Sequence, residues 1–391
     1  MISKQIEKDL SKSSLIRKMF EEGKRLKEMY GAENVYDFSL GNPALQPPTE
    51  LLDSLVKHAP EPNVHRYMLN AGYEDVRQKI AEHHNKTSNV TLSKQNIVMT
   101  VGAAGGLNVV LKALLNPEDE VIVLAPYFVD YLFYIKNYLG FPVIAQTKKD
   151  SFQLDLDNIK SALTPKTKAI ILNSPNNPTG VIYPQKDLEA LSELLKEFEK
   201  ENGIQIAVIS DEPYNQLNYE LPVPNFLNIF DNAVVVNSFS KSLSLAGGRI
   251  GYIIVSPNID NCNLVVGAIV FATRTLGFVN APALYQKAIA DVLDLPSNKD
   301  HYKKMRNELL EIVRGAGFEC VEPDGAFYLF VKSPIPDDKE FASAAAKYNI
   351  LLVPGSGFGC PGYFRLTYCG ELDTILNSKE AFKKLGEEFN L

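Results

Sequence analysis

Short apolar runs alternate with longer amphipathic segments from about residue 72 onwards. The short runs are rich in Val and Ile and lack a polar face, whereas the longer segments repeat their apolar residues with a helical period. Strands that are apolar on both faces are typical of a mostly parallel sheet covered by helices on either side. We therefore predict an α/β fold with strands at about 96–100, 120–124, 142–145, 169–172, 205–210, 234–236 and 251–255.

The segments between these strands predict helices, and a Gly-rich stretch at 101–106 predicts a turn before one of them. Near the start of the chain, apolar residues at helical spacing predict an amphipathic helix over 14–30. Its apolar positions are Leu15, Ile16, Met19, Phe20, Leu26 and Met29. The other helices are expected at about 72–86, 107–115, 155–163 and 185–202, with one more ending near 139.

The last third of the chain does not continue the alternation of short apolar runs and helices. A helical stretch from about 259 to 315 is broken by Pro282 and Pro296. Beyond it, strands are predicted at about 318–322, 327–331, 350–353 and 363–368, separated by two helices. We predict a large domain at residues 46–287, and a smaller α+β domain formed by residues 1–45 together with 288–391.

Composition narrows the class of protein. The 391 residues carry a net charge of −7, which argues against a nucleic-acid or anionic-membrane partner. No apolar run is long enough for a membrane span and the charged start lacks a signal-peptide core, so we expect a cytoplasmic protein. The four cysteines form no Cys-x-x-Cys pair and the five histidines no His-x-x-x-His spacing. We expect free thiols and no metal site.

Ligands of open α/β sheets bind beyond the carboxyl ends of the strands, where this chain carries several polar or aromatic groups. Small residues can admit an anion to backbone amides, and an aromatic ring can stack on a flat ligand. A carboxylate at the end of an apolar strand is costly to bury without a cationic partner, so we expect one. Each feature alone has an ordinary structural explanation, such as tight packing, core burial or an Asx turn. The residues are Gly102, Ala103, Ala104, Tyr127, Phe128, Asn177, Asp211 and Tyr214.

Lys241 follows the strand at 234–236 within Ser-Phe-Ser-Lys-Ser, and Arg249 comes eight residues later. An exposed lysine at a serine-capped helix start is the ordinary explanation. Burial and nearby cations would instead favour the neutral amine, which can form a Schiff base. Together with the other strand ends, such an amine fits one ligand, pyridoxal phosphate (PLP), which needs a lysine, an acid, phenolate donors and an anion site.

Three motifs resemble those of the fold-type I PLP enzymes of the class I/II aminotransferase family. The segment 238–251 matches the family's small-x-small-Lys signature with its later Arg-Ile-Gly. Asn-Pro-Thr-Gly begins 64 residues before the lysine and Asp-x-x-Tyr begins 30 residues before it, in the family's order. The resemblance covers almost the full chain and implies a PLP-dependent aminotransferase that moves an amino group from an L-amino acid to a 2-oxo acid.

The resemblance also implies a role for individual residues. Lys241 would form the Schiff base and shuttle a proton, Asp211 would pair with the ring nitrogen, and Tyr214 and Asn177 would donate to the phenolate oxygen. Phe128 would stack on the ring, with Tyr127 as the alternative. Gly102, Ala103, Ala104, Ser238 and Arg249 would hold the phosphate, reached also by Tyr67 of the partner subunit in a homodimer, while Arg365 and Gly41 would bind the substrate α-carboxylate. Ala103 and Ala104 stand where the family often has a Ser or Thr, so we expect only backbone contacts there.

Two alternatives use the same scaffold. A PLP-dependent carbon–sulfur β-lyase is one, although Ser-Leu-Ser-Leu-Ala-Gly-Gly after Lys241 favours transfer. An effector-binding domain of a regulator is the other, but no basic helix-turn-helix precedes residue 14. For the substrate, Arg274 or Arg66 could bind an acidic side chain, whereas Tyr131 would suit a broader or aromatic range. A dicarboxylate acceptor such as 2-oxoglutarate is the family's default.

Overall fold

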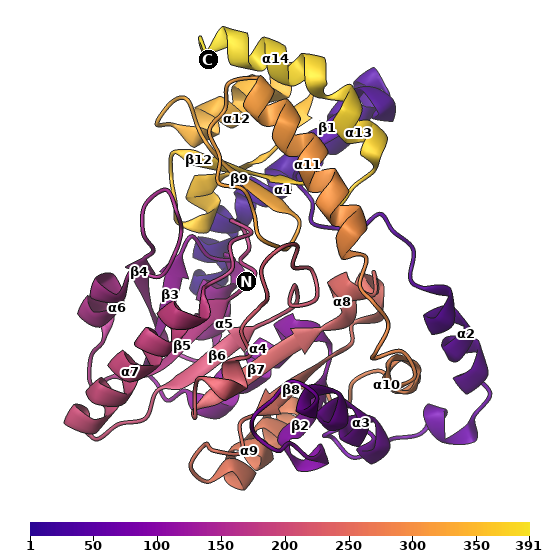
Figure 1. Cartoon of the computed structure of the whole chain (residues 1–391), viewed down its shortest axis with the longest axis vertical. Helices are drawn as coiled ribbons and strands as arrows, with labels where there is room; N and C mark the ends of the chain where they lie inside the picture. The colour runs from indigo at the N-terminus through magenta and orange to yellow at the C-terminus, as the bar shows by residue number, and fades with distance from the viewer.

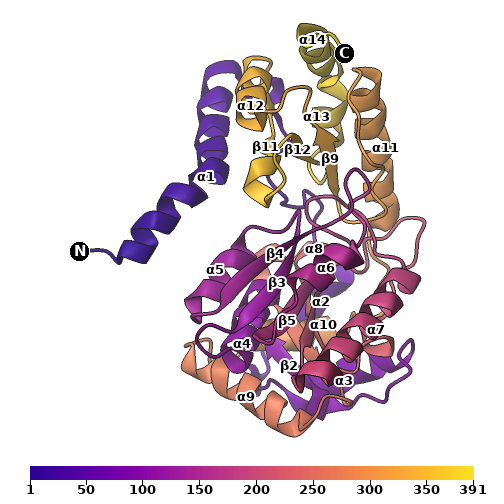
Figure 2. The same cartoon turned by 90° about the vertical axis from the view of Figure 1, so that its left-hand side faces the viewer.

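The computed structural model describes the whole chain apart from the side chains of residues 11–22. It opens with a long helix, α1 (Lys4–Tyr30), whose N-terminal end projects away from the rest of the molecule (Figure 2). The helix predicted over 14–30 is confirmed. Its apolar positions Leu15, Ile16, Met19 and Phe20 lie outside the described residues, whereas Leu26 is buried and Met29 is exposed.

A seven-stranded sheet occupies the lower part of Figure 1. Its strand order is β2-β8-β7-β6-β5-β3-β4, and β8 runs antiparallel to both of its neighbours while the other pairs are parallel. The predicted mostly parallel α/β sheet is therefore confirmed. The strands are β2 (Ile97–Thr100), β3 (Glu120–Ala125), β4 (Phe141–Gln146), β5 (Thr167–Asn173), β6 (Ala207–Asp211), β7 (Ala233–Ser238) and β8 (Gly251–Val255).

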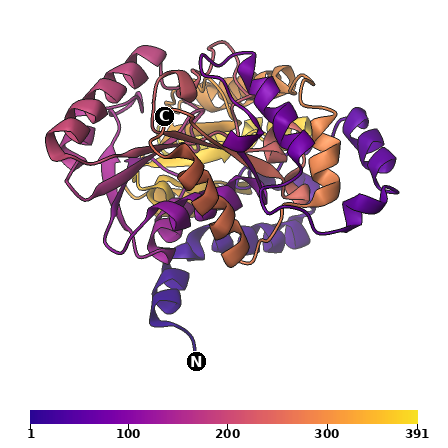
Figure 3. The same cartoon turned by 90° about the horizontal axis from the view of Figure 1, so that it is seen from below.

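Helices cover both faces of this sheet (Figure 3) because successive residues of each strand point to opposite sides. In β3, for example, Val121 and Val123 pack in one core while Ile122 and Leu124 pack in the other. One face is covered by α4 (Gly102–Leu114), α5 (Asp130–Asn137) and α9 (Cys262–Thr275). The other is covered by α2 (Thr49–His58), α3 (Glu74–Asn85), α6 (Leu156–Ala162), α7 (Gln185–Asn202) and α10 (Ala283–Ala290).

The Gly-rich stretch at 101–106 is not the predicted turn. Helix α4 begins at Gly102, five residues before the predicted start. Only Gly102 has a positive φ, at +79°, whereas Gly106 lies so near β7 that a Cβ there would be 2.7 Å from Val236 Cγ1. Glycine at this position lets the helix pack closely on the sheet.

A second core lies above the large sheet in Figure 1. It contains the antiparallel sheet β11-β12-β9 and the parallel pair β1-β10, packed with phenylalanines such as Phe38, Phe341 and Phe382. Its elements are β1 (Tyr36–Asp37), β9 (Tyr328–Lys332), β10 (Ile350–Leu351), β11 (Val353–Pro354), β12 (Tyr363–Thr367), α11 (Lys299–Gly315), α12 (Asp338–Lys347), α13 (Leu372–Asn377) and α14 (Lys379–Glu388).

Two strand predictions in this region need correction. No strand forms over 318–322, where only Cys320 makes an isolated bridge, to Val331. Here Pro323, which lacks an amide hydrogen, ends the extended segment. The strand predicted at 350–353 is two short strands, because β10 pairs with β1 whereas β11 pairs with β12. The proposed domain boundaries, after residues 45 and 287, stay a prediction.

Within the described residues, no helix combines the length and the apolar character that crossing a membrane requires.

Candidate active site

The carboxyl ends of the parallel strands and the second core enclose a cavity of about 320 Å³. Residues from segments far apart in the sequence therefore meet in one place. Most of the predicted site residues line it: Gly41, Ala103, Ala104, Phe128, Asn177, Asp211, Tyr214, Ser238, Lys241, Arg249 and Arg365. Gly102 and Tyr67 do not.

Lys241 lies on α8 (Phe239–Ser242), the single helical turn that follows β7. Ser238 caps this turn by accepting a hydrogen bond from the backbone amide of Ser240, at 3.2 Å. The Lys241 Nζ donates to the carbonyl oxygen of Gly41 at 2.5 Å. Burial, with smaller contributions from Arg365 and Arg249, lowers the pKa of Lys241 to about 8. The amine therefore loses its proton far more easily than that of an ordinary lysine.

Asp211 is the last residue of β6 and is buried. Its Oδ2 accepts a hydrogen bond from the Tyr131 hydroxyl at 2.5 Å, whereas its Oδ1 is buried without a hydrogen-bond partner. Burial raises the pKa of Asp211 to about 7, although the Tyr131 hydrogen bond opposes this shift. We expected a cation beside this carboxylate. Among the described residues its partner is instead a phenol, and one oxygen remains available to a donor in the cavity.

Arg365 on β12 forms the opposite side of the cavity. Its Nη1 donates to the Asn177 Oδ1 at 3.0 Å and its Nη2 to the Ser39 carbonyl oxygen at 2.8 Å. Its Nε is buried without a hydrogen-bond partner, and among the described residues no carboxylate contributes to its pKa. Asn177 is held in turn by its backbone amide, which donates to the Asn173 Oδ1. The result is a buried cation that lacks a counter-ion.

The predicted phosphate side is formed by the starts of α4 and α8. Ala103 and Ala104 lie in the first turn of α4, where unpaired amides and the helix dipole favour an anion. The Arg249 Nη1 donates to the Ser240 Oγ at 3.4 Å and to the Ala246 carbonyl oxygen at 3.1 Å. Gly102 lies outside the cavity lining, but a Cβ there would be 3.0 Å from Arg249 Nη2. It therefore contacts the site through Arg249.

Phe128 and Tyr127, the two candidates for the stacking ring, occupy different positions relative to the cavity. Phe128 lines the cavity, and its ring lies edge-on to Tyr131 at 5.5 Å between centroids. Tyr127 is not among the lining residues, and it packs so closely on Gly359 that a Cβ there would be 2.6 Å from the tyrosine ring. Of the two, only Phe128 lies where it can contact a ligand.

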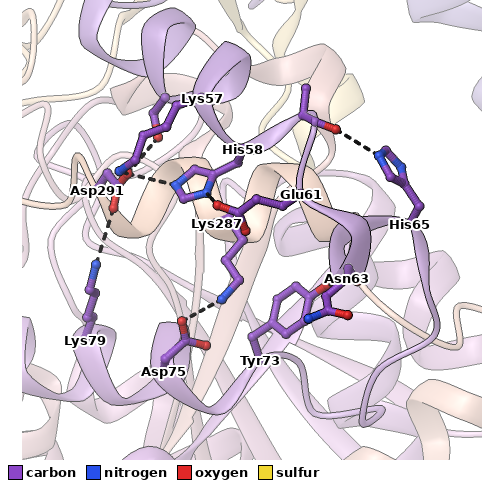
Figure 4. A network of polar contacts seen from close by, with 12 residues as sticks. Lys57, His58, Glu61, Asn63, His65, Tyr73, Asp75, Lys79, Lys287 and Asp291 are labelled. Atoms are coloured by element: carbon purple, nitrogen blue, oxygen red, sulfur yellow. Dashed lines mark hydrogen bonds and ion pairs between the residues drawn. The ribbon is translucent and has the colours of Figure 1, made fainter.

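Tyr67 is 92% exposed and does not contact the cavity of its own chain. A polar network holds the segment before it against the body of the molecule (Figure 4). His58 bridges Glu61 at 2.7 Å and Asp291 at 2.9 Å, and Asp291 also binds Lys57. Although partial burial acts in the other direction, hydrogen bonds from Lys57 and His58 hold the pKa of Asp291 well below its ordinary value. An ordered segment thus presents Tyr67 to the outside.

Neither arginine suggested for an acidic substrate side chain lies in the cavity of this chain. Arg66 and Arg274 are both exposed. The lining also contains residues that were not predicted, among them Ser39, Tyr328 and Phe358. Ser39 and Phe358 contact the Arg365 guanidinium, as does the ring of Tyr328. The sequence around these three residues did not indicate that they line the cavity, because only the tertiary fold brings them to Arg365.

These residues fit PLP by their own chemistry. The cavity combines an amine of lowered pKa, an unpartnered buried carboxylate oxygen, a ring able to stack and a helix start beside an arginine. Each matches a separate part of that cofactor. Among the described residues, no group of three or more His, Cys, Asp or Glu side chains could hold a metal ion.

Comparisons with known proteins agree over almost the whole chain. The family model for aminotransferase class I and II matches residues 33–379. An aspartate aminotransferase of Thermotoga maritima is 32% identical, covering 96% of this chain and 94% of that protein. An aspartate aminotransferase of Bacillus subtilis is 30% identical, covering 93% and 94%. The crystal structure of an amino transferase from Eubacterium rectale is 36% identical, covers 100% of both chains and has a TM-score of 0.95. The chain therefore belongs to the class I and II aminotransferase family and is an aminotransferase.

Proposed function

We propose that the cavity binds PLP and that Lys241, Asp211 and Tyr214 are its catalytic residues. One observation carries the proposal: the lowered pKa of Lys241 and the unpartnered oxygen of Asp211 belong to the same cavity. Asp211 would hold the ring nitrogen, Asn177 and Tyr214 the phenolate oxygen, and Phe128 the face of the ring. The phosphate would be held by Gly102, Ala103, Ala104, Ser238 and Arg249.

When bound, PLP supplies an aldehyde that accepts an amino group in one half-reaction and returns it in the other, and a ring that withdraws electrons. Lys241 Nζ attaches the cofactor at rest and moves the proton of the substrate α-carbon during turnover. Asp211 keeps the ring nitrogen protonated, since its free oxygen accepts that hydrogen bond. Burial of these groups excludes water and strengthens each charge interaction.

The substrates are an amino acid and a 2-oxo acid. We propose that Arg365 binds their α-carboxylate with the backbone of Gly41 beside it. A buried guanidinium without a counter-ion is a strong site for a planar carboxylate, because its fork can form two parallel hydrogen bonds. Aspartate as donor would match the names of the two bacterial relatives, and 2-oxoglutarate is the proposed acceptor.

We also propose a cytoplasmic homodimer in which Tyr67 of the partner subunit completes each site. The loop that carries Tyr67 is held by the segment between α9 and α10, since Asn280 Nδ2 donates to the Leu69 carbonyl oxygen at 2.9 Å. Apolar side chains nearby in the sequence and on α9 are exposed, including Val56 at 74%, Leu69 at 62% and Leu264 at 73%. Exposed apolar surface of this kind favours self-association.

Substitution of Lys241 by alanine tests this function. We expect the variant to lose transfer from L-aspartate to 2-oxoglutarate, because no other lysine lines the cavity within the described residues. Borohydride should fix the cofactor on the peptide that contains Lys241 in the parent protein, as mass spectrometry can check. Lys332→Ala, at an exposed ion pair with Glu319, is the control and should behave as the parent. Retained transfer by Lys241→Ala would refute the proposal.

A further inference from the structure

Tyr328, the first residue of β9, lies between the two halves of the cavity and is 2% exposed. Its hydroxyl is 2.6 Å from the hydroxyl of Tyr214, which belongs to the cofactor half. Its ring lies 4.7 Å from the Arg365 guanidinium, which belongs to the carboxylate half. A single side chain therefore contacts one residue of each subsite.

The hydroxyl pair has two possible directions. If Tyr214 donates to Tyr328, its only hydrogen is used and none remains for a ligand. If Tyr328 donates, the hydrogen of Tyr214 is free to point into the cavity, and accepting a hydrogen bond makes Tyr214 a stronger donor. The direction of this one bond thus decides whether Tyr214 can donate to the cofactor.

The charges around the pair favour Tyr328 as the donor. Burial raises the pKa of Tyr328 to about 12, while the adjacent Arg365 cation opposes the rise. Burial and the neighbouring phenol raise the pKa of Tyr214 well above its ordinary value, and Asp211 adds to the effect. The Arg365 guanidinium packs on the ring of Tyr328 at 4.7 Å, whereas the Asp211 carboxylate acts on Tyr214. A nearby cation makes a hydroxyl a better donor and a nearby anion makes it a poorer one, so Tyr328 donates and Tyr214 accepts.

The ring of Tyr328 has a second effect, on Arg365. The guanidinium contacts two aromatic rings, with Tyr328 at 4.7 Å and Phe358 at 4.8 Å. Both rings stabilise the buried charge through their quadrupoles and restrict the movement of the guanidinium. Because the edges are held by Asn177 and Ser39, little freedom remains for the fork that would receive a carboxylate.

We propose that Tyr328 is a positioning residue for both subsites, its hydroxyl directing the Tyr214 hydroxyl towards the cofactor and its ring fixing Arg365 for the substrate carboxylate. This inference rests on the proposed PLP-dependent function. It predicts two effects that can be separated by substitution, because phenylalanine removes only the hydroxyl and leucine removes the ring as well.

Three variants separate the effects: Tyr328→Phe, Tyr328→Leu and Phe358→Leu. The last is the matched control, since it removes the second ring that contacts Arg365 and keeps both tyrosine hydroxyls. Two properties of the PLP-loaded protein are measured besides turnover: the pH midpoint of the cofactor absorbance, and the dissociation constant of propionate as a probe of the carboxylate subsite. Thermal unfolding of each apoprotein checks that the variants fold.

We expect the absorbance midpoint to rise in both Tyr328 variants and to stay unchanged in Phe358→Leu. A weaker donor leaves the phenolate oxygen holding its proton more tightly, which raises the midpoint. Propionate should bind on the order of tenfold more weakly to Tyr328→Leu and Phe358→Leu, and within about twofold of the parent to Tyr328→Phe.

A midpoint that stays unchanged or falls in Tyr328→Phe would overturn the role of the hydroxyl. Unchanged propionate affinity in Tyr328→Leu would overturn the role of its ring. If Lys241→Ala still catalyses transfer, the proposed function itself fails. If Lys241 is required and the Tyr328 variants match the parent, only the present inference fails.

Discussion

Lys241 is stabilised as a neutral amine chiefly by burial, and the cations of Arg365 and Arg249 act in the same direction. The charged amine is thus costly in the folded apoprotein. Its ordinary pKa of 10.5 applies in the unfolded chain, whereas the folded value is about 8. Below pH 8 both states are protonated and the folded state carries the full penalty. Between these pKa values only the unfolded state keeps its proton, so stability rises with pH.

Replacement of this lysine by methionine, which removes the charge at similar length, should therefore stabilise the apoprotein. At pH 7 we expect a gain in the free energy of unfolding of up to about 3 kcal/mol, and the gain should shrink as the pH rises from 8 towards 10. Denaturant unfolding of both apoproteins at a series of pH values measures the difference. Equal stability at pH 7, or a difference independent of pH, would contradict the lowered pKa.

Asp211 illustrates a different balance at the residue scale. Sequence reasoning expected a cation to compensate for its burial, and the structure instead provides the hydroxyl of Tyr131 on one oxygen. A neutral donor lowers the pKa less than a cation would, so burial dominates and the pKa stays raised. The second carboxyl oxygen of Asp211 can therefore still accept a hydrogen bond from a charged donor. A cationic partner within the chain would have occupied that oxygen.

At the scale of elements, the start of α4 depends on the one glycine with a positive φ in that helix. Alanine at Gly102 would be strained at φ +79°, and its Cβ would press on the Arg249 guanidinium. We expect Gly102→Ala to lose about 1 kcal/mol of stability. PLP should also bind on the order of tenfold more weakly, since a displaced Arg249 costs about one charge-assisted hydrogen bond.

Gly247→Ala is the matched control, because a Cβ at Gly247 meets nothing within 4 Å and this glycine has no positive φ. Its stability and PLP affinity should equal those of the parent. Equilibrium dialysis gives the affinities and thermal unfolding gives the stabilities. Parent-like PLP binding by Gly102→Ala would show that the start of α4 and Arg249 do not act together on the phosphate.

The elements that sequence predicted well are those whose burial is continuous. The seven strands of the large sheet were found because their central positions, which pack against helices, are apolar. The segment 318–322 failed because one bridge, at Cys320, is all the pairing it has. Tyr328 was missed because a tyrosine in an apolar strand resembles ordinary core packing. Its partners are distant in sequence and meet it only in the folded chain.

At the scale of the whole molecule, Tyr67 is exposed and lies outside the cavity of its own chain. The network around Asp291 holds the preceding segment in place, so the exposure of this tyrosine is not a matter of a loose loop. An exposed aromatic side chain on a fixed segment is best placed to contact another molecule. In a symmetric dimer each subunit would supply Tyr67 to the other.

Hybrid dimers can decide whether Tyr67 acts across the interface. Differently tagged Lys241→Ala and Tyr67→Ala chains are mixed after unfolding, refolded, and isolated by both tags. In the hybrid, the subunit that keeps Lys241 receives Tyr67 from its partner, so one of its two sites is complete. We therefore expect about half of the parental activity per dimer, well above either variant alone.

If Tyr67 acted within its own chain, no site of the hybrid would be complete, because one subunit lacks the lysine and the other lacks the tyrosine. Activity would then stay at the mean of the two variants. Failure to recover any doubly tagged species would show instead that the chains do not associate. Both results would refute the shared site. The second would also mean that the exposed Tyr67 contacts a different molecule.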